Sequence, residues 1–152
     1  MNNQLNNKKV LITGSEGFIG SHLVEKLLER NCSVRAMTLY NSFNNWGWLE
    51  TLNKKTLSKI NIISGDIKQK SDVLRSMSGC QIVIHLASLI AIPYSYKSPK
   101  SYFDTNVIGA LNVFESAREL NIKKIIHTST SEVYGSAKYV PIDENHPLQT
   151  QS

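Results

Sequence analysis

The stretch that most constrains this chain is the glycine-containing segment at residues 13–20, Thr-Gly-Ser-Glu-Gly-Phe-Ile-Gly. It lies between an apolar run that predicts a strand and an apolar-periodic run that predicts a helix. Three glycines at a three-residue repeat let the backbone turn tightly, approach a pyrophosphate closely and pack the helix against the strand. The first helical N–H groups and the positive end of the helix dipole then face the anion. The candidate phosphate-binding residues are Gly14, Glu16, Gly17, Phe18, Ile19 and Gly20.

A glycine repeat also occurs in ordinary strand-to-helix turns, so the rest of the chain has to decide. The chain has 152 residues, of which 41% are hydrophobic, which suffices for one globular core and predicts a single domain over residues 1–152. The net charge of +5 comes from basic residues scattered over many segments, such as Lys8, Lys54 and Lys123. Since they form no single basic stripe, nucleic-acid binding is not favoured.

Cysteine content and apolar run length indicate the compartment. Cys32 and Cys80 are the two cysteines, and the sequence has neither a Cys-x-x-Cys pair nor a Cys/His cluster at zinc spacing. This pattern predicts a reduced, cytoplasmic protein without a structural metal. No run approaches the ~20 apolar residues of a membrane span, so no membrane association is expected.

Apolar periodicity divides the chain into alternating strands and helices. Strands are predicted at residues 9–13, 33–39, 60–64, 82–87 and 124–129, and helices at 17–30, 46–57, 71–77 and 100–120, with a loop at 89–99. Because right-handed crossovers put helices on both faces, this order predicts an α/β fold with a Rossmann-type, doubly wound parallel sheet. The helix at 100–120 carries an apolar arc over roughly half its circumference, which implies a second packing partner.

Ligands of such sheets bind outside the carboxyl ends of the strands. The glycine turn and three further segments, 66–67, 85–88 and 128–132, lie at such ends, which favours dinucleotide binding over an ordinary turn. The candidate cofactor-binding residues there are Thr38, Asp66, Ile67, Leu86, Ala87, Ser88 and Thr128, together with Asn106 on the long helix.

Three of the polar residues at these strand ends and on the long helix could have a structural role instead of a functional one. Asp66 fits a strand cap and a contact to an adenine amino group equally well. His85 lies inside an apolar strand, which favours a satisfied core histidine over a catalyst. Asn106 falls within the apolar arc of the long helix, where its amide either bonds a neighbouring loop or organises the backbone of an active site.

The run Thr128-Ser129-Thr130-Ser131-Glu132 is the second informative stretch. It follows the last predicted strand and precedes Val133-Tyr134-Gly135, so it places hydroxyl donors and a carboxylate at the mouth where a nicotinamide would lie. A hydroxyl there can hydrogen-bond a reacting alkoxide or carbonyl, and a glutamate can remove a proton alpha to a carbonyl.

Together, the glycine turn, His85-Leu86-Ala87, the Asn106 helix and residues 129–135 resemble the cofactor-binding half of extended short-chain dehydrogenases/reductases, the epimerase/dehydratase family that acts on nucleotide sugars. The resemblance runs from about Lys8 onward. Glu132 after Thr130-Ser131 is similar to 4,6-dehydratases and UDP-glucuronate decarboxylases rather than 4-epimerases. The segments 40–49 and 89–96 resemble dehydratases of legionaminic-acid-type pathways, which act on a nucleotide-linked N-acetylglucosamine.

This resemblance implies a mechanism and three catalytic residues. C4 of the sugar is oxidised, Glu132 removes the C5 proton, water leaves from C6 and hydride returns to C6. Thr130 bonds the C4 oxygen, with Ser131 nearby. Another branch of dehydratases has an aspartic acid in place of Ser131, which leaves Glu132 as a candidate for both proton transfers. One alternative is a UDP-glucuronate decarboxylase or other nucleotide-sugar epimerase. Another is a non-catalytic NAD(P)-binding module.

Two departures from the family pattern shape the expectations. The family's Tyr-x-x-x-Lys pair would fall beyond Ser152, and Tyr134 with Lys138 belongs to an earlier motif. We therefore expect a truncated enzyme without its substrate-binding domain, inactive by itself, and a homodimer through the Lys100–Leu120 helix at full length. The second strand also ends at Thr38 instead of an acidic residue that would hold the ribose of NAD. With Tyr40, Asn41, Ser42 and Arg35 nearby, the cofactor is NADP or NAD, with a slight preference for NADP.

Overall fold

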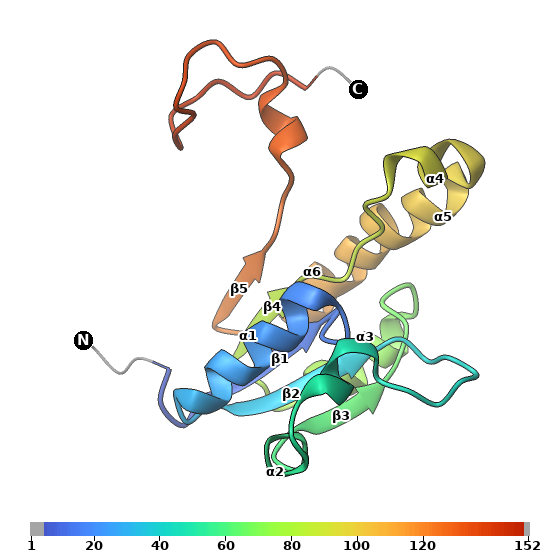
Figure 1. The fold of residues 1–152 in the computed structure, drawn as a ribbon, viewed down its shortest axis with the longest axis vertical. Helices are drawn as coiled ribbons and strands as arrows, with labels where there is room; N and C mark the ends of the chain where they lie inside the picture. The colour runs from blue at the N-terminus through green and yellow to red at the C-terminus, as the bar shows by residue number, and fades with distance from the viewer. Residues whose placement is uncertain (1–4, 151–152) are drawn as a thin grey trace.

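The computed structural model describes residues 5–150, and the predicted domain limits at residues 1–4 and 151–152 lie outside this range. Five parallel strands form one sheet in the order β3-β2-β1-β4-β5 (Figure 1). The strands are β1 (Lys9–Thr13), β2 (Ser33–Thr38), β3 (Asn61–Ser64), β4 (Ile82–His85) and β5 (Lys124–His127). The predicted α/β, Rossmann-type doubly wound sheet is confirmed.

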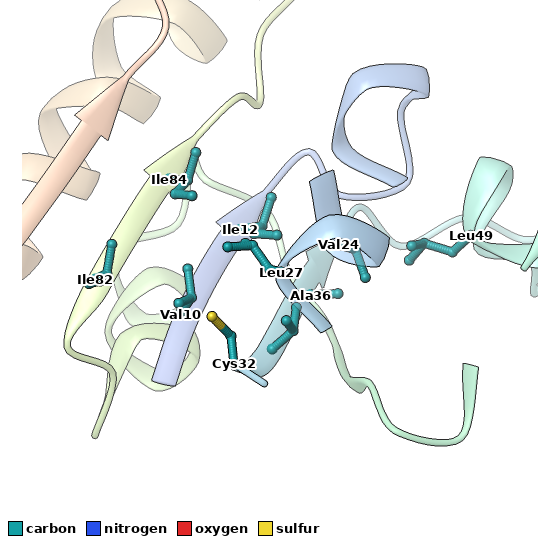
Figure 2. Packing of buried hydrophobic residues seen from close by; sticks show 10 residues of the cluster. Val10, Ile12, Val24, Leu27, Cys32, Ala36, Leu49, Ile82 and Ile84 are labelled. Carbon is teal, nitrogen blue, oxygen red and sulfur yellow. The ribbon is translucent and has the colours of Figure 1, made fainter. Parts of the chain in front are cut away.

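The central strand β1 is buried on both of its faces. Val10 and Ile12 pack on one side with Val24 and Leu27 of α1 (Phe18–Glu29), as Figure 2 shows. Leu11 packs on the other side, in a cluster formed with α3 (Lys70–Met77) and α6 (Gly109–Glu119). A strand covered by helices on both faces needs consecutive apolar residues, which is why the sequence of β1 does not alternate.

The strands β1 and β3 end at the predicted residues, whereas β2 ends one residue, and β4 and β5 end two residues, before the predicted ends. Thr13 of β1 pairs with His85, and His85 pairs with His127, so three strands end at the same edge. The Leu86 N–H donates to the carbonyl oxygen of Thr13 at 3.2 Å, and the Ala87 N–H then donates to the Thr13 hydroxyl oxygen, so β4 ends beside the end of β1. The residues that follow these strands are therefore free to line the edge.

The predicted loop at residues 89–99 is wrong in part, because it contains the helix α4 (Ile92–Lys97). Pro93 lies in the first turn of that helix, where proline is tolerated since its missing N–H has no intrahelical acceptor. The predicted helix at 46–57 is interrupted at Leu52, whose ψ of 144° is extended. It forms two short pieces, the 3-10 helix η1 (Gly47–Thr51) and α2 (Lys54–Leu57).

The predicted helix at 100–120 consists of three consecutive pieces: α5 (Pro99–Tyr102), a π-helical segment η2 (Phe103–Ile108) and α6. Val113 and Ala117 pack on the sheet, while four apolar side chains of the wide arc are exposed: Phe103, Val107, Leu111 and Phe114. Beyond β5 the chain extends away from the sheet through the 3-10 helix η3 (Ser131–Tyr134), as Figure 1 shows. Within residues 5–150, no helix is both long and apolar enough to cross a membrane.

Candidate functional site

The glycine turn is locked between β4 and α1 by two very close approaches. Gly14 has a φ of +68°, and a Cβ built there would lie 2.8 Å from the backbone N and Cα of Ala87. A Cβ on Gly20 would lie 2.2 Å from the Gly14 carbonyl oxygen. Both glycines are thus required by the protein's own packing, Gly14 also by its left-handed backbone conformation.

Gly17 differs from the other two glycines. A Cβ there would meet the Gly14 oxygen at 3.4 Å, an ordinary contact, so the packing of this chain alone does not demand glycine. Gly17 precedes the first turn of α1, which has no side-chain cap. The N–H groups of a first helical turn lack intrahelical acceptors, so a backbone without a Cβ beside them suits an approaching anion.

Phe18 and Ile19 follow in that first turn with largely exposed side chains. The Phe18 ring lies edge-on against Trp48, at 5.3 Å between centroids. What these two residues offer a phosphate is therefore their backbone N–H groups rather than their side chains.

A buried hydrogen-bond network joins the end of β1 to the end of β4. The Thr13 hydroxyl oxygen accepts the N–H groups of Leu86 and Ala87, each at 3.2 Å, and lies 2.6 Å from His85 Nδ1. Because both lone pairs of that oxygen are used, its single proton is donated to Nδ1, which assigns His85 as the neutral tautomer protonated at Nε2. Burial, with a smaller contribution from the stacked His127, lowers the His85 pKa to about 4. The expectation of a satisfied core histidine is confirmed.

Glu16 bridges the glycine turn to the end of β2. Its Oε1 accepts the Leu39 N–H at 2.8 Å, and its carbonyl oxygen accepts the Trp48 N–H at 2.9 Å. Its Oε2 is buried and has no hydrogen-bond partner among residues 5–150. Burying a carboxylate oxygen without a hydrogen-bond donor raises the free energy of the folded state, so a ligand that supplies a donor to this atom would be stabilised there.

A first hollow of about 280 Å³ lies at this edge of the sheet. It is lined by the glycine turn at Gly14, Glu16 and Gly17, by Leu39, and by residues 65–68 and 86–89. Most of the predicted cofactor residues meet here: Asp66, Ile67, Leu86, Ala87 and Ser88.

Asp66 is held by local bonds in this structure. One oxygen of its carboxylate accepts the Lys68 N–H at 2.9 Å and the other lies 3.3 Å from Lys68 Nζ. Asn112 of α6 fixes the same turn by donating to the carbonyl oxygens of Ile67 and Lys68, each at 3.0 Å. The Asp66 carboxylate is thus held within the turn that follows β3, at a position that borders the hollow, and its contact to an adenine amino group stays a prediction.

A second hollow of about 500 Å³ lies on the other side of residues 86–89, which line both. Its further lining includes His85, Asn106, His127, and four residues of the second informative stretch: Thr128, Ser129, Thr130 and Glu132. Thr130 caps η3, since its hydroxyl accepts the Glu132 N–H at 3.3 Å. Ser131 is exposed in the first turn of η3 and is not part of the lining.

Asn106 lies on η2 and bonds Leu89 twice, its Oδ1 accepting the Leu89 N–H and its Nδ2 donating to the Leu89 oxygen, both at 2.8 Å. Leu89 belongs to the wall between the two hollows. The predicted helix-to-loop bond of Asn106 is therefore observed, and its role in organising an active-site backbone stays a prediction. Contrary to expectation, Asn106 itself is exposed.

Two expectations at the end of β2 need correction. Thr38 is 1% exposed and does not line either hollow, because its side chain turns into the protein. Arg35 donates from Nη1 to the carbonyl oxygens of Ser76 and Ser78, at 2.9 and 2.7 Å, so it serves the end of α3 and not a cofactor phosphate. Tyr40, Asn41 and Ser42 also lie outside the lining of the first hollow.

Sequence reasoning did not single out Thr13 and Asn112. Thr13 has the signal of a polar residue closing a buried strand, and Asn112 that of an amide in the apolar arc of a helix, as Asn106 has. Across residues 5–150, no group of three or more His, Cys, Asp or Glu side chains is placed to hold a metal ion.

The parallel sheet, the glycine turn and two hollows that share one wall define a dinucleotide-binding domain of the Rossmann type. Residues 11–152 match the model of the GDP-mannose 4,6 dehydratase family. The chain therefore belongs to this family of extended short-chain dehydrogenases/reductases.

Among its relatives is a putative UDP-glucose 4-epimerase of Methanocaldococcus jannaschii, 38% identical over 146 residues, which cover 94% of this chain and 45% of the relative. A solved UDP-N-acetylglucosamine 4-epimerase from Methanobrevibacter ruminantium, in complex with UDP-N-acetylmuramic acid, superposes with a TM-score of 0.82 at 32% identity. That match covers 97% of this chain and 46% of the other.

A UDP-glucose 4-epimerase from Bifidobacterium longum, in complex with NAD+ and UDP, superposes with a TM-score of 0.81 at 30% identity over 93% of this chain and 43% of the other. The chain thus spans less than half the length of the relatives it matches. All three relatives are named as nucleotide-sugar 4-epimerases, and the Bifidobacterium longum enzyme is the one described in complex with NAD+.

Proposed function

We propose that this chain is the cofactor-binding domain of a nucleotide-sugar 4,6-dehydratase that converts an NDP-N-acetylglucosamine to its 4-keto-6-deoxy sugar. The observation that carries the proposal is Glu132, a carboxylate that borders the second hollow beside Thr130, at the carboxyl end of the sheet. Since the relatives are about twice as long, the activity is proposed for a protein that joins this chain to a substrate-binding part. The chain alone is expected to be inactive.

The residues fit a nicotinamide dinucleotide that spans both hollows. The uncapped start of α1 at Gly17 suits the pyrophosphate, and the unpartnered Glu16 oxygen suits a hydroxyl donor of the first ribose. The nicotinamide ring then belongs in the second hollow. When bound, the oxidised cofactor takes hydride from C4 and returns it to C6.

The residues of this chain would carry out the proton chemistry at C5 and C6. As C4 is oxidised, the proton of its hydroxyl would pass to the tyrosine of the family's Tyr-x-x-x-Lys pair, which is expected beyond Ser152, while the Thr130 hydroxyl hydrogen-bonds the C4 oxygen. The new carbonyl acidifies the C5 proton. The Glu132 carboxylate would remove that proton, and water would leave from C6 with a proton donated by Glu132 or by a group of the substrate-binding part. Ser131, one residue from Glu132, would assist from the rim.

The relatives with a 4-epimerase name favour a second candidate, a nucleotide-sugar 4-epimerase. An epimerase also oxidises C4 but leaves the C5 proton in place, so it has no use for a carboxylate at Glu132. A UDP-glucuronate decarboxylase would use a similar Ser-Glu pair.

The proposal is tested on the complete protein with UDP- and GDP-N-acetylglucosamine in deuterated water. A dehydratase gives a product one water lighter with deuterium at C5, whereas an epimerase gives an unlabelled product of unchanged mass. The Glu132→Gln variant should lose ~10²-fold or more of the dehydration rate while C4 oxidation still reduces the cofactor. An unlabelled product of unchanged mass from the natural protein would rule out the dehydratase.

Two further proposals follow from the fold. The exposed apolar side chains of η2 and α6 suit a homodimer in which these helices pair. A cytoplasmic location is in keeping with two buried, free cysteines, Cys32 and Cys80, and with a nucleotide-sugar substrate.

A further inference from the structure

We propose that Glu16 is the residue that selects the cofactor, and that it favours NAD over NADP. The inference rests on the proposed dinucleotide site and reverses the preference suggested by Thr38. Rossmann domains that bind NAD use an acidic residue about 20 residues after the glycine turn to hold the ribose hydroxyls. Here the carboxylate comes from the glycine turn itself.

The position of the Glu16 carboxylate carries the argument. The acidic residue of the usual arrangement would stand at Thr38, the last residue of β2, whose own side chain is buried. Glu16 Oε1 accepts the N–H of the next residue, Leu39, at 2.8 Å, and Glu16 and Leu39 both line the first hollow. The Glu16 carboxylate therefore lies at the end of β2, where the usual arrangement would have the acidic residue that Thr38 replaces.

The backbone holds this carboxylate in place. The Glu16 carbonyl oxygen accepts the Trp48 N–H at 2.9 Å, and a Cβ on Gly47, whose φ is +54°, would lie 2.7 Å from that oxygen. The Ser15 hydroxyl donates to the Met37 oxygen at 2.9 Å, which ties the turn to β2. The backbone of Glu16 is thus held by the segment at residues 47–48, and the residue before it is held by β2.

The remaining oxygen of the carboxylate is available to a ligand. Glu16 Oε2 is buried without a hydrogen-bond partner among the described residues. The terminal torsion of a glutamate side chain is soft, so the carboxylate can turn this oxygen toward a donor. Two neighbouring ribose hydroxyls supply such donors, whereas a 2′-phosphate brings negative charge and no donor that the carboxylate could use.

The charged groups around the first hollow give a 2′-phosphate no free partner. Among the lining residues, Lys68 is the cation, and it is paired with Asp66 at 3.3 Å. Arg35, the other basic candidate, donates to the end of α3. Since the charges of Asp66 and Lys68 cancel, the net negative charge of the lining comes from Glu16.

The test measures equilibrium binding of NAD+ and NADP+ to the chain by calorimetry, with no need for turnover. We expect NAD+ to bind about tenfold or more tightly than NADP+, since hydrogen bonds to a charged group are among the stronger ones. Glu16→Gln keeps an acceptor for the Leu39 N–H but removes the charge, and it should bring the two affinities close together.

Glu50→Gln is the matched control, because Glu50 Oε1 also accepts one backbone N–H, from Trp46 at 3.0 Å, but Glu50 lies outside the hollow. It should leave the ratio of affinities unchanged. Competition between adenosine and adenosine 2′-monophosphate on the natural chain gives the same answer without any variant, should Glu16→Gln fold poorly.

Each outcome decides a different point. Equal or tighter binding of NADP+ by the natural chain, or an NAD+ preference that Glu16→Gln leaves intact, overturns the role of Glu16 while the dinucleotide site stands. No binding of either dinucleotide overturns the proposed function and this inference with it.

Discussion

Acidification should destabilise the chain through His85, because the folded structure holds this imidazole neutral. His85 is 3% exposed, and its Nδ1, assigned above as the acceptor of the Thr13 hydroxyl proton, lies 2.6 Å from the hydroxyl oxygen. A proton added at Nδ1 would meet a hydroxyl oxygen that already accepts two N–H groups. Protonation therefore requires the Thr13 network, which joins β1 to β4, to break.

The magnitude follows from the pKa of His85 in the folded and unfolded chains. Burial lowers this pKa from an ordinary 6.5 to about 4. Below about pH 6.5 the unfolded chain binds a proton that the folded chain does not, so stability falls as pH falls. Linkage gives a loss of about 2 kcal/mol at about pH 5 and about 3 kcal/mol near pH 4, with full stability above about pH 7.

Urea denaturation across this pH range measures the effect. His85→Asn is the comparison variant, because its amide oxygen can accept the Thr13 proton but does not titrate. Contributions of other groups cancel in the difference between the two curves. One of them is Asp143, whose pKa is lowered by hydrogen bonds from Tyr139 and the Asn145 backbone. Parallel curves for the two proteins, or an imidazole signal of His85 that titrates near pH 6.5 in the folded chain, would refute the reasoning.

Two other predictions concern the glycine turn and the exposed helix face. Gly20→Ala should destabilise the fold by about 1–3 kcal/mol in urea denaturation, because its Cβ would lie 2.2 Å from the Gly14 oxygen. Gly17→Ala should fold normally, because its Cβ would lie 3.4 Å from the Gly14 oxygen, but it should lose dinucleotide binding. Normal binding by this variant would contradict a pyrophosphate site beside Gly17. Leu111→Asp should convert the complete protein from dimer to monomer in sedimentation, while Val140→Asp, at a 79% exposed apolar residue elsewhere, should not. A natural protein that sediments as a monomer would contradict the proposed pairing.

Much of the fold could be predicted from local patterns. The consecutive apolar residues of β1 indicate a strand buried on both faces, and the periodic apolar residues of α1 indicate its packing face. The ends of β1 and β3 were predicted to the residue, but β2, β4 and β5 end one or two residues early. At the end of β4, the Ala87 N–H donates to the Thr13 hydroxyl oxygen, a side-chain bond that the local pattern does not show. The helix α4 was not predicted, since two prolines and two tyrosines in this segment have the composition of a loop.

The candidate site could be predicted as a set of segments. Residues 66–67, 86–88 and 128–132 lie at the carboxyl edge because parallel strands all end there, and this follows from element order alone. Which side chains face a ligand does not follow from element order. Thr38 and Arg35 stand at suitable positions in the sequence, but one is buried and the other is bonded to the end of α3.

The sequence by itself determined the Rossmann fold, the place of the glycine turn and the family resemblance, because periodicity and glycine spacing are properties of neighbouring residues. Tertiary structure alone decided that the carboxylate beside Leu39 belongs to Glu16, 23 residues earlier in the chain. It also placed a shared wall, fixed by Asn106, between two hollows. The physical reason is that such contacts depend on how the turn, the strands and the helix pack together, and no local pattern encodes that distance.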